Sequence, residues 1–267
     1  MPGNRVQLRQ DPRLRAVEWH DLTTLTSGQK ARELLISLPW FVVSVVLFQY
    51  GWIVPALVAA FAFFLAGLRQ AHGAQHYSLG IPRFAQDCLL SGLSVVMLSS
   101  LHALQATHMH HHRHALEPTD IESAAARMPW WKAILSGPWF ILALNREGYR
   151  LAKPAKRTWI RTELILMVAY VVSVVAWAPR GLRWFTFAMI VGECLTGFFA
   201  VWTVHHDCDP EHQLARTQRG WWKTALTYQM FYHVEHHLFP AVPTPRLPEL
   251  AARLDSAMPH LRNQQVF

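Results

Sequence analysis

Long uncharged stretches alternate with polar, histidine-bearing stretches along the chain. Residues 34–68 contain no Asp, Glu, Lys or Arg, and a polar break at 49–52 divides them in two. Because a membrane-spanning helix needs about 20 apolar residues, this stretch predicts two short spans joined by a turn. A second pair is predicted at residues 164–179 and 184–204, with its turn at 180–182. The pattern therefore predicts an all-α integral membrane protein with four transmembrane helices in two hairpins.

Composition and charge favour a multi-pass membrane protein. The 267 residues are 52% hydrophobic and 16% charged, whereas soluble domains average about 25% charged residues. Of the 25 Lys and Arg residues, 23 lie at 1–33, 69–161 and 205–267, which share one side if both hairpins span. The positive-inside rule makes that side cytoplasmic. Although the net charge is +8, the Arg residues are spread between apolar stretches, so we expect no nucleic acid partner.

The same pattern predicts one domain over residues 1–267. Residues 1–33 would form a cytoplasmic N-terminal segment. Residues 34–204 would form the membrane core with a central cytoplasmic region, and residues 205–267 a cytoplasmic C-terminal region.

Eight histidines form three clusters beside the apolar stretches. The clusters are His72 and His76; His108, His111 and His112; and His233, His236 and His237. Residues three or four positions apart share one face of a helix, so each cluster presents its imidazoles together. Histidine is the commonest metal ligand, and ionisable groups in membrane segments are usually functional. Three such helices can enclose two metal ions, and imidazole suits Fe, Zn, Cu and Ni.

Other histidines and acidic residues are candidates for supporting roles. His205 and His206 end the fourth predicted span, and one of them is a candidate ninth ligand. His110 and His114 would point away from the cluster on their helix. A ligating imidazole usually donates its other N–H to a carboxylate or carbonyl. The candidate acids are Asp120, Glu122, Asp207, Asp209 and Glu235. Glu193, the one ionisable residue in the four spans, would line a substrate tunnel or contact a ligand histidine.

Two further apolar stretches are not expected to cross the membrane. Residues 88–107 are uncharged and long enough to do so. A crossing there would place the first and second clusters on opposite faces, where they could not share a site. We therefore expect this stretch, which includes His102, to be re-entrant or packed under the membrane surface. Residues 134–145, broken by a Gly-Pro pair, are too short to cross and are expected at the interface.

The clusters resemble the histidine boxes of the membrane fatty acid desaturase superfamily. The boxes read HxxxH at 72–76, HxxHH at 108–112, and HVEHHLFP from His233, followed by AVPTPRLPEL. The resemblance covers roughly residues 34–254 and implies a four-helix membrane core with a cytoplasmic helical cap that holds a non-haem di-iron centre. It also implies O2-dependent oxidation of an unactivated C–H bond in a lipid. The eight clustered histidines, with His205 or His206 added, would be the iron ligands.

The leading interpretation is an acyl-lipid desaturase. The alternative is a carotenoid ketolase or hydroxylase, or another lipid hydroxylase of the superfamily, because bacterial carotenoid ketolases have a comparable length and a similar HHEHHL-P ending. A membrane metal-binding or transport protein is a third interpretation, which would place polar residues at mid-membrane. Substrate, chain length and regiochemistry stay open.

An electron donor is expected to be a separate protein, such as a ferredoxin-like protein or a reductase. The chain contains no His-Pro-Gly-Gly motif, which the resemblance would associate with a fused b-type cytochrome. The cytoplasmic face is expected to be positive, which suits anionic lipid or an acidic donor. The residues are Arg113, Arg127, Lys153, Lys156, Arg157, Arg216, Arg219 and Lys223.

Overall fold

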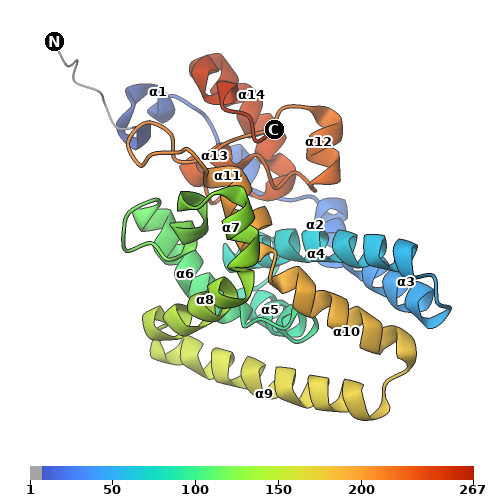
Figure 1. Cartoon of the computed structure of the whole chain (residues 1–267). Coiled ribbons are helices and arrows are strands. Elements are labelled where there is room, and N and C mark those ends of the chain that lie inside the picture. The colour runs from blue at the N-terminus through green and yellow to red at the C-terminus, as the bar shows by residue number, and fades with distance from the viewer. Residues whose placement is uncertain (1–7) are drawn as a thin grey trace.

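The structure is a computed structural model that describes residues 8–267, and this part of the chain is helical (Figure 1). The first seven residues of the expected N-terminal segment lie outside the described residues. Between residues 8 and 267 there is no β-strand, and the β-structure consists of two isolated bridges. The prediction of an all-α fold is confirmed for this part of the chain.

The helices follow one another in this order. The N-terminal part comprises η1 (Leu8–Gln10), α1 (Pro12–Arg15), η2 (His20–Thr23) and α2 (Ser27–Leu35). Next come α3 (Leu38–Gln49), α4 (Ile53–Gln75), α5 (Arg83–Met97) and α6 (Leu101–His114). The central part comprises η3 (Glu122–Arg127), α7 (Trp130–Leu135), α8 (Gly137–Leu151), α9 (Pro154–Trp177) and α10 (Arg180–Glu193). The C-terminal part comprises the π-helix η4 (Gly197–Trp202), α11 (Thr203–His205), α12 (Trp221–Leu226), α13 (His233–Leu238), η5 (Thr244–Arg246), α14 (Leu247–Ala257) and η6 (Pro259–Asn263).

Several helices have the length and apolar surface of membrane spans. The segments that qualify alone are Ser27–Gln49, Ile53–Gln75 and Pro154–Trp177. Two bent pairs qualify when each is taken as one span: α5 with α6, and α10 with Gly197–His205. The outward side chains of α9 are apolar, and Ile165, Val168 and Val175 are 65–69% exposed. Such a surface indicates contact with lipid. The chain is thus a membrane protein with three to five candidate spans, and the four-span topology stays a prediction.

Both predicted hairpins are present as antiparallel pairs, α3–α4 and α9–α10, which extend away from α11–α14 in Figure 1. The first turns at residues 50–52, as predicted, where Gly51 has a φ of +81°; glycine adopts this region without steric cost. The second turn lies at 178–179 instead of the predicted 180–182. Pro179 explains the shift, because proline lacks an N–H and holds the preceding residue in an extended conformation.

The fourth predicted span, residues 184–204, is not one continuous α-helix. α10 ends at Glu193, and the chain bends by 43° before it continues as the π-helix η4 and α11. A π-helical turn is rare and changes the direction of the side chains that follow it. η4 packs against η3, α7 and α8, and it leads directly to His205 at the end of α11.

The stretch predicted to be re-entrant turns back on itself. Leu98 ends α5 with a φ of +63°, and α6 leaves at an angle of 111° to α5. The Ser100 hydroxyl caps α6 by accepting a hydrogen bond from the Ala103 N–H at 3.3 Å. On α8, Gly148 lies so close that a Cβ atom there would be 2.1 Å from the Ala103 carbonyl oxygen. Glycine at this position therefore lets α8 pack directly on α6.

A buried carboxylate on α9 holds this turn in place. Glu163 accepts hydrogen bonds from the Ser100 hydroxyl at 2.5 Å and from His102 Nδ1 at 2.5 Å. On its other side, His102 Nε2 lies 3.1 Å from a carboxylate oxygen of Asp87, which also binds Lys156 at 2.6 Å. His102 and Glu163 are both fully buried. The network joins α5 and α6 to Lys156 and Glu163, which lie about two helical turns apart on α9.

A second apolar cluster lies apart from the membrane helices and supports the C-terminal part. Val234 of α13 is fully buried against Leu250, Leu254 and Met258 of the α14 region and against Leu14 of α1. The third histidine cluster is therefore carried by a helix whose position depends on this core.

Removing the Glu163 carboxylate should destabilise the protein strongly, because His102 and Ser100 would lose their partner in a buried site. We expect Glu163→Met to lower the free energy of unfolding by about 3 kcal/mol. Denaturant unfolding in detergent micelles measures this difference. Glu147→Gln is the control, since Glu147 is partly exposed and lies 3.5 Å from Arg150. Equal unfolding free energies for both variants would contradict the role of Glu163.

Candidate metal centre

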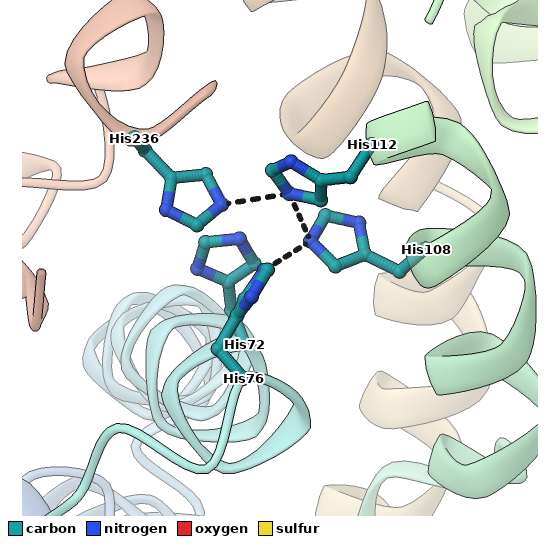
Figure 2. A group of neighbouring side chains, drawn as sticks. All are labelled: His72, His76, His108, His112 and His236. Carbon is teal, nitrogen blue, oxygen red and sulfur yellow. Dashed lines mark hydrogen bonds between the residues drawn. The ribbon is translucent and has the colours of Figure 1, made fainter. Parts of the chain in front are cut away.

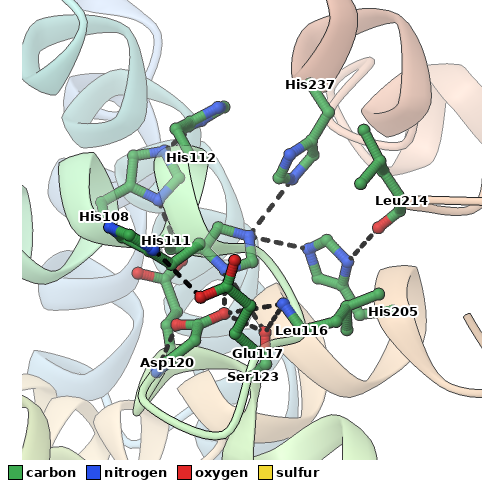
Figure 3. Close-up of polar contacts among 12 residues, drawn as sticks. His108, His111, His112, Leu116, Glu117, Asp120, Ser123, His205, Leu214 and His237 are labelled. Atoms are coloured by element: carbon green, nitrogen blue, oxygen red, sulfur yellow. Dashed lines mark hydrogen bonds and ion pairs between the residues drawn. The ribbon is translucent and has the colours of Figure 1, made fainter. Parts of the chain in front are cut away.

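Nine imidazoles from four elements converge in two groups (Figures 2 and 3). The five-histidine group comprises His72, His76, His108, His112 and His236. The four-histidine group comprises His111, His205, His233 and His237. Within each group, one nitrogen of every ring lies within 4.8 Å of the corresponding nitrogen of each other ring. The three predicted clusters thus meet, and each supplies side chains to one or both groups.

In the five-histidine group the Nε2 atoms point at one another (Figure 2). His108 Nε2 lies 2.9 Å from His76 Nε2 and 3.1 Å from His112 Nε2. His236 Nε2 lies 2.9 Å from His112 Nε2, and the buried His72 Nε2 has no hydrogen-bond partner among the described residues. Two imidazole nitrogens that bind one ion at about 2.1 Å and at right angles would be about 3 Å apart. The spacing therefore fits ligands of a shared metal ion.

The four-histidine group has similar spacing and is fully buried. His111 Nε2 lies 3.2 Å from His205 Nε2 and 3.2 Å from His237 Nε2 (Figure 3). His233 Nε2 lies 3.0 Å from His205 Nε2 and 3.2 Å from His237 Nε2. Each of the four rings has another ring of the group at hydrogen-bond distance. Too few N–H donors are available, however, for all of these contacts to be hydrogen bonds.

The partners on the other side of the rings explain why donors are few. His111 Nδ1 lies 2.7 Å from Asp120, and His205 Nδ1 lies 2.9 Å from the Leu214 carbonyl oxygen. A neutral imidazole has one N–H, so donation from both Nδ1 atoms leaves two facing Nε2 lone pairs. Facing lone pairs repel each other in a buried site, and a cation between them removes the repulsion. The tautomers set by Asp120 and Leu214 thus fit a metal ion in this group.

Two of the five candidate acids orient imidazoles. Asp120 binds His111, as described, and Glu122 accepts a hydrogen bond from His108 Nδ1 at 2.8 Å. Ser123, which the sequence analysis did not single out, donates to Asp120 and holds its carboxylate against the ring (Figure 3). Ligating histidines commonly have such partners, which fix the ring and raise its basicity.

The other three acids have different partners, which corrects the sequence-based expectation. Asp207 pairs with Arg216, and Asp209 pairs with His212. Glu235 lies inside the third cluster, but its carboxylate binds Arg219 at 2.5 Å and the Thr217 hydroxyl at 2.8 Å. On α13, positions 233, 236 and 237 share one face of the helix, so position 235 points elsewhere.

The ion pairs of two arginines attach the histidine-bearing helices to their surroundings. Arg219 joins Glu235 of α13 to Asp255 of α14, at 2.5 and 2.8 Å. Arg69, one turn before His72 on α4, binds Glu33 at 2.5 Å and also donates to the Tyr228 carbonyl at 2.5 Å. Both pairs restrict the helix that carries the ligands, and they therefore help to define where the imidazoles point.

Three histidines that are close in sequence to the converging ones lie outside both groups. His206 turns away from His205, stacks on Trp202 with ring centroids 4.0 Å apart, and donates from Nδ1 to the Trp202 carbonyl at 2.8 Å. His110 and His114 stack on each other. Of the two candidates for a ninth ligand, the structure brings only His205 into a group, because the chain leaves the helical conformation at His206.

Burial keeps the imidazoles of the third cluster in the form that binds metals. The pKa values of His233, His236 and His237 lie well below the ordinary value of 6.5. The main cause is burial, which disfavours the charged form, and neighbouring imidazoles add to it. These rings are therefore neutral near pH 7, as metal coordination requires.

A family model described as fatty acid desaturase matches residues 50–265, which is most of the chain and includes all nine converging histidines. The chain therefore belongs to the fatty acid desaturase family. No curated protein matches the sequence.

The positions of His205 and His206 predict opposite effects on metal content. His205→Ala should lower the bound metal by about one ion per chain, because it removes one of four nitrogens from a site that needs about four. His206→Ala should leave the metal content unchanged. Elemental analysis by mass spectrometry of the purified variants measures both. A loss of metal in the His206 variant and not in the His205 variant would reverse the assignment.

Replacing Asp120 should weaken metal binding without removing a ligand. His111 Nδ1 and the Ser123 hydroxyl both donate to Oδ2 of Asp120. Asp120→Asn removes the negative charge from this acceptor, so we expect metal affinity to fall by about 10–100-fold. Competition with a chelator of known affinity measures the change. Asp209→Asn is the matched control, because Asp209 pairs with His212 at the exposed surface. An equal loss in both variants would show that Asp120 has no particular role in orienting His111.

Proposed function

We propose that this member of the fatty acid desaturase family is an O2-dependent di-iron lipid oxidoreductase, and specifically an acyl-lipid desaturase. The observation that carries the proposal is an apolar cavity whose wall includes His72 and His108 of the five-histidine group and His233 of the four-histidine group. A hydrocarbon chain in this cavity would lie against both groups at once. Family membership makes a lipid the expected substrate.

The cavity wall is suited to a hydrocarbon chain. Its apolar residues come from α4, α6, α8, η4, α11 and the segment before α13. They are Leu68, Ala71, Leu101, Leu104, Leu144, Phe199, Ala200, Val201, Val204, Met230 and Phe231. An apolar cavity with a few polar groups at one place binds an apolar ligand and fixes its position. Because misplacement by about 1 Å can slow a reaction about 100-fold, this wall would select the carbon atoms that react.

Nine imidazole ligands fit two iron ions, five residues around one and four around the other. Two bound iron ions would supply the reduction of O2 and the removal of hydrogen from an unactivated CH2 group. The chain would contribute neutral nitrogen ligands, the carboxylates of Asp120 and Glu122 that hold His111 and His108, and an apolar wall that excludes water. Loss of two neighbouring hydrogens, together with reduction of one O2 by two electrons from the donor protein and uptake of two protons, would give a double bond and two water molecules. Imidazole also suits other metals, so iron is inferred from the family.

For the topology, we propose four spans in two hairpins, with the α5–α6 pair re-entrant and the histidines in a cytoplasmic helical cap. The 111° turn between α5 and α6 supports this arrangement, because it allows the first and second clusters to meet on one side. The distribution of Lys and Arg supports a cytoplasmic location for that side. All segments would belong to one domain, as the sequence pattern predicts.

Electrons would come from a separate donor protein that docks on the positively charged face. Part of the expected basic set is occupied by internal contacts, since Arg219 binds Glu235 and Lys156 binds Asp87. Arg113, Arg127 and Lys153 are exposed and are the better candidates for contact with an acidic donor. Complementary charge of this kind mainly accelerates association.

Lipid analysis tests the proposed reaction directly. The wild type and His236→Ala should be expressed in a host that lacks related enzymes, together with a ferredoxin and its reductase. The wild type should produce an acyl chain that is lighter by two hydrogens, and the variant should not. His212→Ala, which changes an exposed histidine outside both groups, should behave as the wild type. Mass spectrometry of total fatty acids and pigments measures this outcome.

A different product would change the assignment. An acyl chain heavier by one oxygen would indicate a hydroxylase, and a ketone in a supplied carotenoid would indicate a ketolase of the same family. Bound metal without any lipid product, in the presence of donor and O2, would favour a metal-binding or transport protein.

A further inference from the structure

The cavity beside the two histidine groups has one polar position that no protein group satisfies. Thr196 lines it at the start of η4, among Phe199, Ala200 and Val201. The residue is only 4% exposed, and within residues 8–267 its hydroxyl oxygen has no hydrogen-bond partner. An unpaired hydroxyl in apolar surroundings is costly, so its retention next to a ligand cavity requires an explanation.

The break between α10 and η4 explains why the Thr196 hydroxyl is free. A threonine in a helix usually donates to the carbonyl four residues earlier. Thr203 does so with the Phe199 carbonyl at 2.7 Å. For Thr196 the corresponding carbonyl belongs to Gly192, which accepts the N–H of Leu195 at 2.8 Å where the helix tightens. The break that bends the chain by 43° lies between Gly192 and Thr196, and the usual bond from the Thr196 hydroxyl to the Gly192 carbonyl is not made.

A second unsatisfied atom lies beside the first. Glu193, at the end of α10, is 5% exposed, and its Oε1 has no hydrogen-bond partner among the described residues. The Thr196 hydroxyl lies close enough to the Glu193 carboxyl, three positions earlier, to interact with it, but the contact does not have the geometry of a hydrogen bond. Thr196 lies at the wall of the apolar cavity, and Glu193 is its neighbour in the same membrane segment. Together these two buried polar groups mark a place where a ligand atom would be held.

We propose that Glu193 and Thr196 form a subsite for a hydroxyl group on the lipid substrate. The Thr196 O–H would donate to the ligand oxygen, and the ligand O–H would donate to Glu193 Oε1. One hydroxyl thus satisfies both atoms. A ketone oxygen accepts a hydrogen bond but has none to donate, and a CH2 group offers neither. The proposal rests on the proposed function, because it places a lipid chain in this cavity.

This subsite defines a substrate class and a place in a reaction sequence. The preferred substrate is a lipid chain that already carries a hydroxyl group at some distance from the carbon that is oxidised. The reaction that supplies it is therefore a hydroxylation of the same chain. Buried polar groups discriminate strongly against ligands that leave them unpaired, which makes such a subsite selective.

Ligand-induced thermal stabilisation of the purified protein in detergent tests the subsite without requiring turnover. The probes are a saturated fatty acid and its monohydroxy and monoketo derivatives, with the oxygen moved along the chain. At one position the hydroxy acid should bind wild type about tenfold more tightly than the unsubstituted acid, with the keto acid in between. A tenfold ratio corresponds to about 1.4 kcal/mol, the size of one hydrogen bond.

Thr196→Val and Glu193→Met should each abolish the preference for the hydroxy acid. Thr196→Val should also raise the melting temperature without ligand, because it removes an unpaired hydroxyl and keeps the volume. Thr203→Val is the matched control: its hydroxyl is paired with the Phe199 carbonyl and it does not line the cavity. The control should keep the preference and should not gain stability.

Two results would overturn the subsite: equal binding of the hydroxy and unsubstituted acids at every position, or a lower melting temperature for ligand-free Thr196→Val. Tighter binding of the keto acid than of the hydroxy acid would overturn the assignment to a hydroxyl group. Failure of the subsite is distinguishable from failure of the proposed function. Desaturation without any hydroxyl preference contradicts only the subsite, whereas hydroxyl preference without any oxidised product contradicts only the desaturase.

Discussion

The repulsion between buried imidazole lone pairs is the constraint on which the rest of this structure depends. His111 and His205 face each other through Nε2 while their Nδ1 atoms are engaged by Asp120 and Leu214. A cation bound between the two Nε2 atoms would remove this repulsion, provided that the backbone holds the rings in place. The rings come from α4, α6, α11 and α13, which lie far apart in the sequence. The fold must therefore position four separate elements before any metal is bound.

Ion pairs and hydrogen bonds of a few charged side chains provide much of that positioning. Glu163 fixes the turn that starts α6, Arg69 joins α4 to the segment before α13, and Arg219 joins α13 to α14. Such contacts are expensive to desolvate. Replacement of both partners by apolar residues would often be neutral for stability, whereas loss of one partner is destabilising. Such contacts fix the orientation of the helices that carry the histidines, because charged groups form hydrogen bonds in only a few geometries. Each cluster of ligands in the candidate centre is thus close to one polar contact that restricts its helix.

The sequence was sufficient for features that depend on local spacing and not for those that depend on tertiary contacts. Histidines three or four positions apart predicted shared helix faces, and the structure brings all eight of them together. The choice between His205 and His206 could not be made, because it depends on where the helix ends. Glu235 was a candidate to orient an imidazole because it lies within the third cluster, but Arg219 is nearer. Asp120 and Glu122 were identified correctly because they follow the second cluster closely along the chain.

The break after α10 shows how a local irregularity can determine chemical selectivity. A continuous helix over residues 184–204 would have satisfied the Thr196 hydroxyl through the Gly192 carbonyl, and the cavity wall at that place would have been apolar. The observed turn gives that carbonyl to Leu195, redirects η4, and leaves two polar atoms without partners. Hydrogen bonds that a helix would normally make internally then become available to a ligand. If the proposed subsite holds a hydroxyl group, this single change would be enough to distinguish an oxygenated chain from a plain one in an apolar cavity.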